Sequence, residues 1–250
     1  MKRTMIRKMA AVVLLIYSCS STKIKKSESA AIRAVKISHN FPFIDKNGKL
    51  LRYDTGSNVN VYYLRDQVLY RDFYSWDSYV NDTLIKSEIR ESFFVYSKGK
   101  TYGYFYDKNK AEFDRRLLID SMLKEQWYNQ SGFSNVAFFK VSEQYNSGLG
   151  TLDKTYLTTG KVDTTMRGTT TFFYTSHLNW VDYNLVKKSD TINKMKLCKV
   201  RSVTYGRYMK EYNMTLDTIV QLSEMKEIPV INPQEILYYF DREKKYNSGK

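Results

Sequence analysis

The chain is poor in the residues that most often carry metal and disulfide chemistry. Its 250 residues include two cysteines and two histidines. Neither a Cys-x-x-Cys nor a His-x-x-x-His spacing occurs, so a transition-metal site would need ligands from scattered positions. Two cysteines cannot staple a chain of this length, which excludes a disulfide-rich scaffold. We therefore expect no metal and no other cofactor.

The motifs of several enzyme classes are absent or incomplete. No Gly-x-Ser-x-Gly nucleophile turn occurs. Gly99-Lys100-Thr101 resembles the end of a phosphate-binding loop, but Phe94 stands where that loop has its first glycine. Ser121-Met122-Leu123-Lys124 matches the Ser-x-x-Lys of penicillin-binding enzymes, but the partner motifs of those enzymes are missing. The sequence thus identifies no catalytic residue and favours a protein that is not an enzyme.

Long hydrophobic runs are also lacking. The clearest apolar run is Met9–Ile16, which is too short to cross a bilayer as a helix. A small residue, Ser18, follows this run, and four basic residues precede it: Lys2, Arg3, Arg7 and Lys8. This order is typical of a signal peptide, so we expect residues 1–18 to be removed.

The end of this segment, Ile16-Tyr17-Ser18-Cys19, resembles the lipobox of bacterial lipoproteins. In that family the cysteine is lipidated and the chain is cut before it. The resemblance implies that Cys19 is the lipid-attachment residue and that N-terminal acyl chains hold the protein on a membrane. Tyr17 departs from the small or β-branched residue that is usual at its position. The alternative is an ordinary secretory signal peptide.

Acidic residues are scarce relative to basic ones, and the net charge is +14. Four of these charges lie in residues 1–18, so the chain from Cys19 carries about +10. We expect residues 19–38 to be the lipidated N-terminus and a flexible basic tether beside anionic head groups. Export makes nucleic acid a poor partner for this charge. Ser20 resembles the residue that permits sorting to an outer membrane, which predicts a lipid-anchored envelope protein facing the periplasm.

The remaining sequence predicts a mainly β fold with minor α: an antiparallel curved sheet or half-barrel meander with one packed helix and a C-terminal helix. Turn signals at Asp45-Lys46-Asn47-Gly48 and Ser97-Lys98-Gly99-Lys100 separate short alternating segments. The expected strands are 59–63, 67–73, 91–96, 101–106, 136–141, 154–159, 169–175, 178–183, 194–205 and 217–222.

Two segments have helical signals. Residues 111–126 place apolar side chains at helical spacing, and Asn232-Pro233-Gln234-Glu235 is typical of a helix start. We expect a single strand-rich domain over residues 39–241 and a charged tail over residues 242–250. A meander interrupted by a helix is similar to the half-barrel of lipoprotein carriers, and this resemblance implies a fold only.

Aromatic residues are abundant, with 22 tyrosines and 13 phenylalanines. Tyr102, Tyr104 and Tyr106 share one face of an expected strand. With Trp180, they are candidate contacts for a lipid, a glycan or an envelope protein in a Tyr-rich concavity. The alternative is that these tyrosines are ordinary half-buried strand residues. The binding interpretation makes the protein a non-catalytic envelope lipoprotein.

The alternative function is an envelope hydrolase that acts on glycan or lipid through carboxylates. Asp77 lies beside Trp76, and Asp182 lies beside Trp180, as in sites where carboxylates act next to aromatic platforms. This reading requires two carboxylates, or His177 and a carboxylate, to meet in one cleft. The second cysteine, Cys198, lies in an expected strand, where an unpaired buried thiol behaves as a small apolar side chain.

Overall fold

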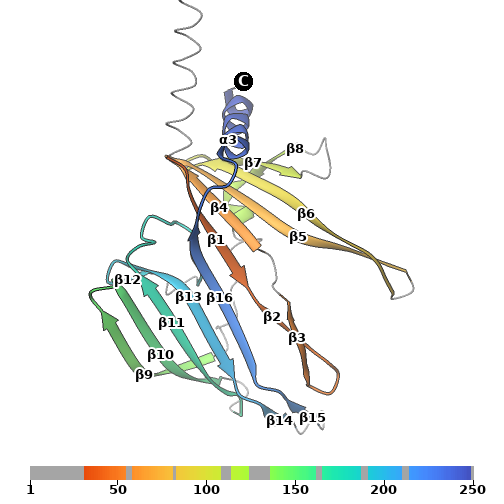
Figure 1. Ribbon diagram of the computed structural model, residues 1–250, viewed down its shortest axis with the longest axis vertical. Coiled ribbons are helices and arrows are strands. Elements are labelled where there is room, and N and C mark those ends of the chain that lie inside the picture. Colours follow the sequence, from red (N-terminus) through yellow and green to blue (C-terminus); the bar gives the residue numbers. More distant parts are fainter. Residues whose placement is uncertain are drawn as a thin grey trace, which may run out of the picture.

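One large antiparallel sheet dominates the computed structural model (Figure 1). The structure describes residues 31–54, 58–80, 83–107, 114–123, 136–161, 165–186, 191–209 and 214–248. The lipobox-like motif with Cys19 lies outside these residues. The strands are β1 (Arg33–His39), β2 (Phe41–Ile44), β3 (Leu50–Asp54), β4 (Asn58–Leu64), β5 (Gln67–Val80), β6 (Thr83–Ser97), β7 (Tyr102–Asp107), β8 (Asp114–Leu118), β9 (Val136–Asn146), β10 (Thr151–Gly160), β11 (Arg167–Thr175), β12 (Thr191–Ile192), β13 (Met195–Thr204), β14 (Arg207–Met209), β15 (Met214–Leu216) and β16 (Ile219–Ile228).

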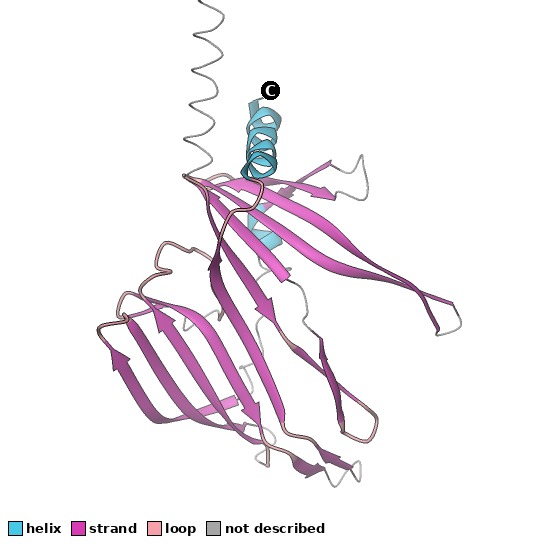
Figure 2. Cartoon of the chain, viewed as in Figure 1, coloured by secondary structure: helices cyan, strands magenta, loops and turns pink. Residues whose placement is uncertain are grey.

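Two runs of neighbouring strands form the sheet, and they meet at its centre. The order is β8-β7-β6-β5-β4-β1-β16-β13-β11-β10-β9, with β12 added beside β13. Strand β1 pairs with β4 on one side and with β16 on the other, so segments near opposite ends of the chain lie side by side. The predicted fold class, mainly β with minor α, is confirmed (Figure 2).

The long helix α3 (Pro233–Ser248) covers one face of the β4–β7 half of the sheet (Figure 1). Phe240 is fully buried, and the rings of Phe93 and Tyr239 stack with centroids 4.1 Å apart. The helix begins at Pro233, as the sequence predicts. Its apolar face packs on β1, β4, β5 and β6, and this small core contains Ile32, Ala34, Tyr62, Leu64, Leu69, Phe93, Val95, Ile236, Leu237, Tyr239 and Phe240.

The predicted limits of the domain are wrong at both ends. Residues 33–38, expected in the tether, belong to β1, because Ala34 and Ile37 are buried on opposite faces of a central strand. Residues 242–248, expected in a charged tail, continue α3. Glu243 is buried there, and its carboxylate accepts hydrogen bonds from Gln67 Nε2 at 2.9 Å and Ser97 Oγ at 3.1 Å.

Two element predictions are also wrong. Of the helix expected over residues 111–126, residues 114–118 form β8 and only α2 (Ile119–Met122) is helical. Leu123 follows α2 directly. Residues 111–113 and 124–126 of that segment lie outside the described residues. Pairing with the edge of β7 satisfies the backbone of β8 and outweighs its helical spacing. The strand expected over residues 178–183 is a turn and an irregular segment.

Both predicted turns are confirmed. Asp45 Oδ1 accepts hydrogen bonds from the backbone N–H groups of Asn47 at 2.8 Å and Lys49 at 2.9 Å. Gly48 has φ +84°, and Gly99 has φ +76° in the turn between β6 and β7. Such positive φ angles favour glycine, which is why these short signals predict the turns correctly.

Candidate functional site

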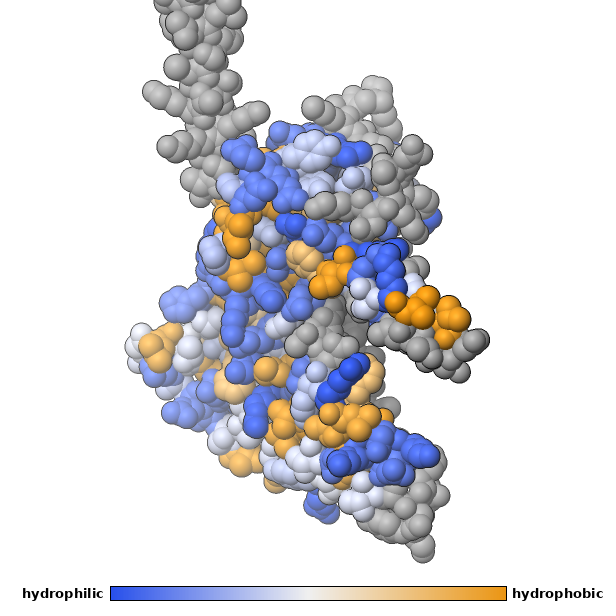
Figure 3. All heavy atoms as spheres, turned by 45° about the vertical axis from the view of Figure 1, so that its right-hand side comes forward, coloured by the Kyte–Doolittle hydropathy of each residue, from blue (hydrophilic) through white to orange (hydrophobic). Residues whose placement is uncertain are grey.

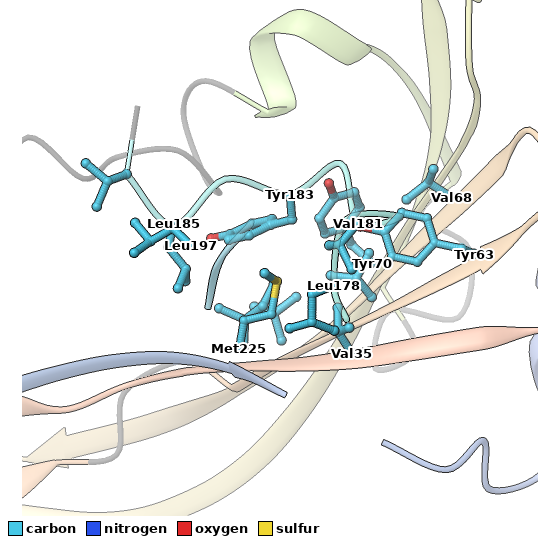
Figure 4. Close-up of a cluster of buried hydrophobic side chains, with 14 of the residues drawn as sticks. Val35, Tyr63, Val68, Tyr70, Leu178, Val181, Tyr183, Leu185, Leu197 and Met225 are labelled. Carbon is cyan, nitrogen blue, oxygen red and sulfur yellow. The ribbon is translucent and has the colours of Figure 1, made fainter. Parts of the chain in front are cut away.

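The concave face of the sheet is filled by the protein itself. The irregular segment between β11 and β12, here called the crossing segment (residues 176–186), runs across this face. Tyr183 and Leu185 are almost fully buried, and the rings of Tyr183 and Tyr70 lie 6.4 Å apart. Figure 4 shows these side chains facing Tyr70, Leu197 and Met225 of the sheet. The tyrosine-rich concave face is therefore a hydrophobic core at this place.

The four candidate ligand contacts do not share one surface. Tyr104 is buried and Tyr106 is half-buried on the side covered by α3, where Arg242 Cζ lies 5.6 Å and 4.8 Å from their ring centroids. Tyr102, on the same face of β7, lies beside Arg116. Trp180 belongs to the crossing segment and packs on the opposite face of the sheet. The structure thus places the three tyrosines on one face of β7, with Tyr104 and Tyr106 beside α3, and leaves Trp180 on the opposite face of the sheet.

Trp180 contacts two residues of the sheet. Its ring lies edge-on to Tyr63 with centroids 5.3 Å apart, and Arg33 Cζ stacks 3.7 Å from the centroid of the indole. A guanidinium over an indole is a favourable cation–π contact. These contacts hold the crossing segment against β1 and β4.

The carboxylates that the sequence suggested for hydrolysis lie far apart. Asp77 accepts a hydrogen bond from Ser87 Oγ at 2.6 Å, whereas Asp182 forms an ion pair with Lys98. Ser87 lies in β6 and Lys98 follows the last residue of that strand, so roughly 35 Å of extended chain separates these two partners. His177 is exposed in the crossing segment. These three residues do not form one cleft.

A row of polar side chains that sequence reasoning missed crosses β5, β6 and β7. Asp72 lies opposite Ser92, which lies opposite Asp107. The Tyr74 hydroxyl donates to Asp107 Oδ2 at 3.4 Å. Ser92 and Asp107 are buried. The sequence contained a signal for Asp72, because it follows Val68 and Tyr70 at every second position of β5 and so lies on the same inward face.

The carboxyl group of Asp72 in this row has a strongly shifted pKa. Burial raises the pKa of its carboxyl to about 6, and a backbone hydrogen bond from Phe73 opposes this only in part. Its Oδ1 atom is buried and has no hydrogen-bond partner among the described residues. The pKa of the Asp72 carboxyl therefore lies close to neutral pH.

Cys198 behaves as the sequence predicts for a structural thiol. It is half-buried, and Sγ donates to the backbone carbonyl of Phe173 at 3.3 Å. Burial raises the pKa of the thiol to about 11, so the reactive thiolate is suppressed at neutral pH.

An open apolar groove lies on the outer face of the sheet, at the ends of β9, β10 and β11. Its volume is about 420 Å³, within the range of small-molecule sites. Phe139 and Leu157 are opposite each other on neighbouring strands and are 58 % and 50 % exposed. The lining residues are Phe139, Leu157, Thr158, Thr159, Arg167, Gly168 and Tyr205. This groove is a candidate binding site among the described residues.

Arg167 gives the groove a positive charge at one end. It lies opposite Thr159, and its side chain forms no ion pair with any residue that the structure describes. Gly168 allows β11 to approach β13 closely, because a Cβ there would lie 2.2 Å from the carbonyl oxygen of Val203. The groove therefore combines exposed apolar surface with a cation that is available to a ligand.

No protein-family model matches the chain, and no curated protein matches it either. None of the described helices has the length and apolar character needed to cross a membrane. Function must therefore be inferred from the residues and their geometry.

Proposed function

We propose that this chain is a membrane-anchored lipoprotein of a bacterial cell envelope with a non-catalytic binding role. The lipobox-like residues that end at Cys19, and the basic residues after them, support this proposal. The anchor is the acyl chains on Cys19, and the domain faces the periplasm from the outer membrane.

The ligand of this protein is an anionic amphiphile of the lipid class, bound in the groove on the outer face. The main support for this ligand is that exposed Phe139, Leu157 and Tyr205 line the groove together with the positively charged Arg167. An acyl chain would cover the apolar side chains, and a carboxylate or phosphate would pair with the guanidinium. Because the crossing segment fills the concave face, the outer groove is better suited to this ligand than the concavity.

The anchor is tested by metabolic labelling with a palmitate analogue. Cells that produce the wild-type chain should incorporate the label, and globomycin should change its processing. The Cys19→Ala variant should lose essentially all of the label, because it lacks the acceptor thiol. Equal labelling of the two proteins would contradict the lipoprotein assignment.

The groove is tested by titration with a dansyl-labelled fatty acid, followed by fluorescence. We expect Arg167→Ala to weaken binding about tenfold, since a charge-assisted contact contributes roughly 1.5 kcal/mol or more. Arg201→Ala is the matched control, because Arg201 is an exposed arginine of β13 that does not line the groove. Equal affinities for both variants would exclude Arg167 from ligand binding.

One observation favours the alternative function, an envelope hydrolase that uses carboxylates. The raised pKa of Asp72, in a row with Asp107, is the kind of environment that equips a carboxyl as a general acid. Its test is hydrolysis of purified envelope glycan or lipid. A hydrolase would show turnover that Asp72→Asn lowers at least a hundredfold, whereas a binding protein shows none in either form.

A further inference from the structure

The hairpin of β5 and β6 extends well beyond the rest of the sheet (Figure 1). Pairing of β4 with β5 ends at Asn58 and Phe73, and pairing of β7 with β6 ends at Ser92 and Asp107. Beyond these points, residues 74–80 and 83–90 pair only with each other among the described strands. We call this two-stranded ribbon the arm. A ribbon of this kind is marginally stable in water by itself, so the arm is suited to a further partner.

The arm exposes large apolar side chains. Ile89 is 76 % exposed, Ile85 is 62 % exposed and Val80 is 53 % exposed. Figure 3 shows apolar side chains on the projecting part of the molecule, next to hydrophilic ones. Apolar side chains on a strand with an open edge are typical of a surface that pairs with another strand.

The sequence along β6 is self-complementary about Ser87. It reads Ile85-Lys86-Ser87-Glu88-Ile89. In an antiparallel pair of two such strands centred on Ser87, Lys86 of each copy lies opposite Glu88 of the other. Ile85 likewise lies opposite Ile89 of the second copy. Opposite charges and apolar pairs at directly opposed positions both stabilise antiparallel strands.

We propose that the arm pairs with the arm of a second copy of this chain, antiparallel through β6 and about a two-fold axis at Ser87. On the side away from β5, residues 85–89 pair with no described strand, and the second copy would supply hydrogen-bond partners there. Glu88 already contacts Lys86 at 2.7 Å and Arg90 at 2.7 Å, and it gains the Lys86 of the second copy. This proposal is independent of the groove and of its ligand.

The ladder is short, because a bulge interrupts the pairing of β5 and β6 at Ile85. The dimer contact is therefore modest in area. Confinement of both copies to one membrane would raise their effective concentration and favour such a contact.

Disulfide cross-linking of the full chain tests the proposal directly. The Ser87→Cys variant places the two thiols opposite each other across the two-fold axis, at a separation that a disulfide can bridge. On oxidation with copper phenanthroline in native membranes, we expect most of this variant to migrate as a covalent dimer on a non-reducing gel. Ser147→Cys, at an exposed serine in the turn between β9 and β10, is the matched control and should remain largely monomeric. Equal dimer fractions in the two variants would overturn the proposal.

Charge exchange on the Ser87→Cys background separates strand pairing from chance encounters. Adding Lys86→Glu places two glutamates opposite each other, and we expect the dimer fraction to fall at least fivefold. Adding Glu88→Lys to that protein restores opposite charges and should recover most of the dimer. Failure of the first change to lower the dimer fraction, or of the second to recover it, would show that β6 does not pair in this register.

Discussion

Replacing Leu185 with alanine should lower the free energy of unfolding by about 4 kcal/mol. Leu185 is fully buried in the crossing segment, within the same core as residues of β5, β11 and β13. Truncation of a buried leucine removes its transfer free energy and leaves a cavity, and typical losses are 2–5 kcal/mol. Urea denaturation of the wild-type and variant proteins, followed by circular dichroism, measures the difference.

The matched control for this prediction is Leu149→Ala. Leu149 is 62 % exposed in the turn between β9 and β10, so its truncation should change the free energy of unfolding by less than about 0.5 kcal/mol. If both variants were equally stable, the crossing segment would not be part of the core. The concave face would then be open to a ligand, and the proposed site would move from the outer groove to that face.

Replacing Asp72 with asparagine should stabilise the protein at pH 8 and have little effect at pH 4. The pKa of Asp72 is raised from its ordinary value of 3.8 to about 6 in the folded protein. Ionisation of this carboxyl therefore costs up to about 3 kcal/mol of stability, because one pKa unit corresponds to about 1.4 kcal/mol. The asparagine removes the charge but keeps a polar group in the same place, so we expect a gain of roughly 2 kcal/mol.

The direction of the pH dependence follows from the raised pKa. Below pH 3.8 the carboxyl is neutral in both the folded and unfolded states, so the wild type has no penalty there. Stability is lost as the pH rises toward 6, and above that the full penalty applies. Thermal denaturation at pH 4, 6 and 8 should show a growing advantage of Asp72→Asn, while Asp241→Asn at an exposed position of α3 should show none. A constant difference at all three pH values would mean that Asp72 titrates normally.

Local signals in the sequence predicted the local structure well. The turns at residues 45–48 and 97–100 need residues that tolerate positive φ, and glycine supplies them in both. Strands β4, β7, β10 and β11 form where the sequence predicts strands. The start of α3 is likewise set by Pro233, whose fixed φ suits the first position of a helix.

The candidate site could not be predicted in the same way. The groove brings together Phe139, Arg167 and Tyr205 from three separate parts of the chain, and nothing in their local sequences relates them. The sequence shows Asp72 as a polar residue at an inward position. That its Oδ1 atom lacks a hydrogen-bond partner among the described residues depends on how β6 and β7 pack beside it. Tyr104 and Tyr106 of β7 lie beside α3 because the strand order puts them there.

The sequence by itself determined the turns, most of the strands and the mainly β class, because each depends on residues that are near neighbours in the chain. Only the tertiary structure decided that β1 is a central strand, that residues 114–118 form a strand paired with β7 instead of a helix, and that Glu243 is buried. The physical reason is the same in each case. Strand pairing and burial are contributed by distant segments, and their free energy exceeds the small local preferences that a sequence pattern reports.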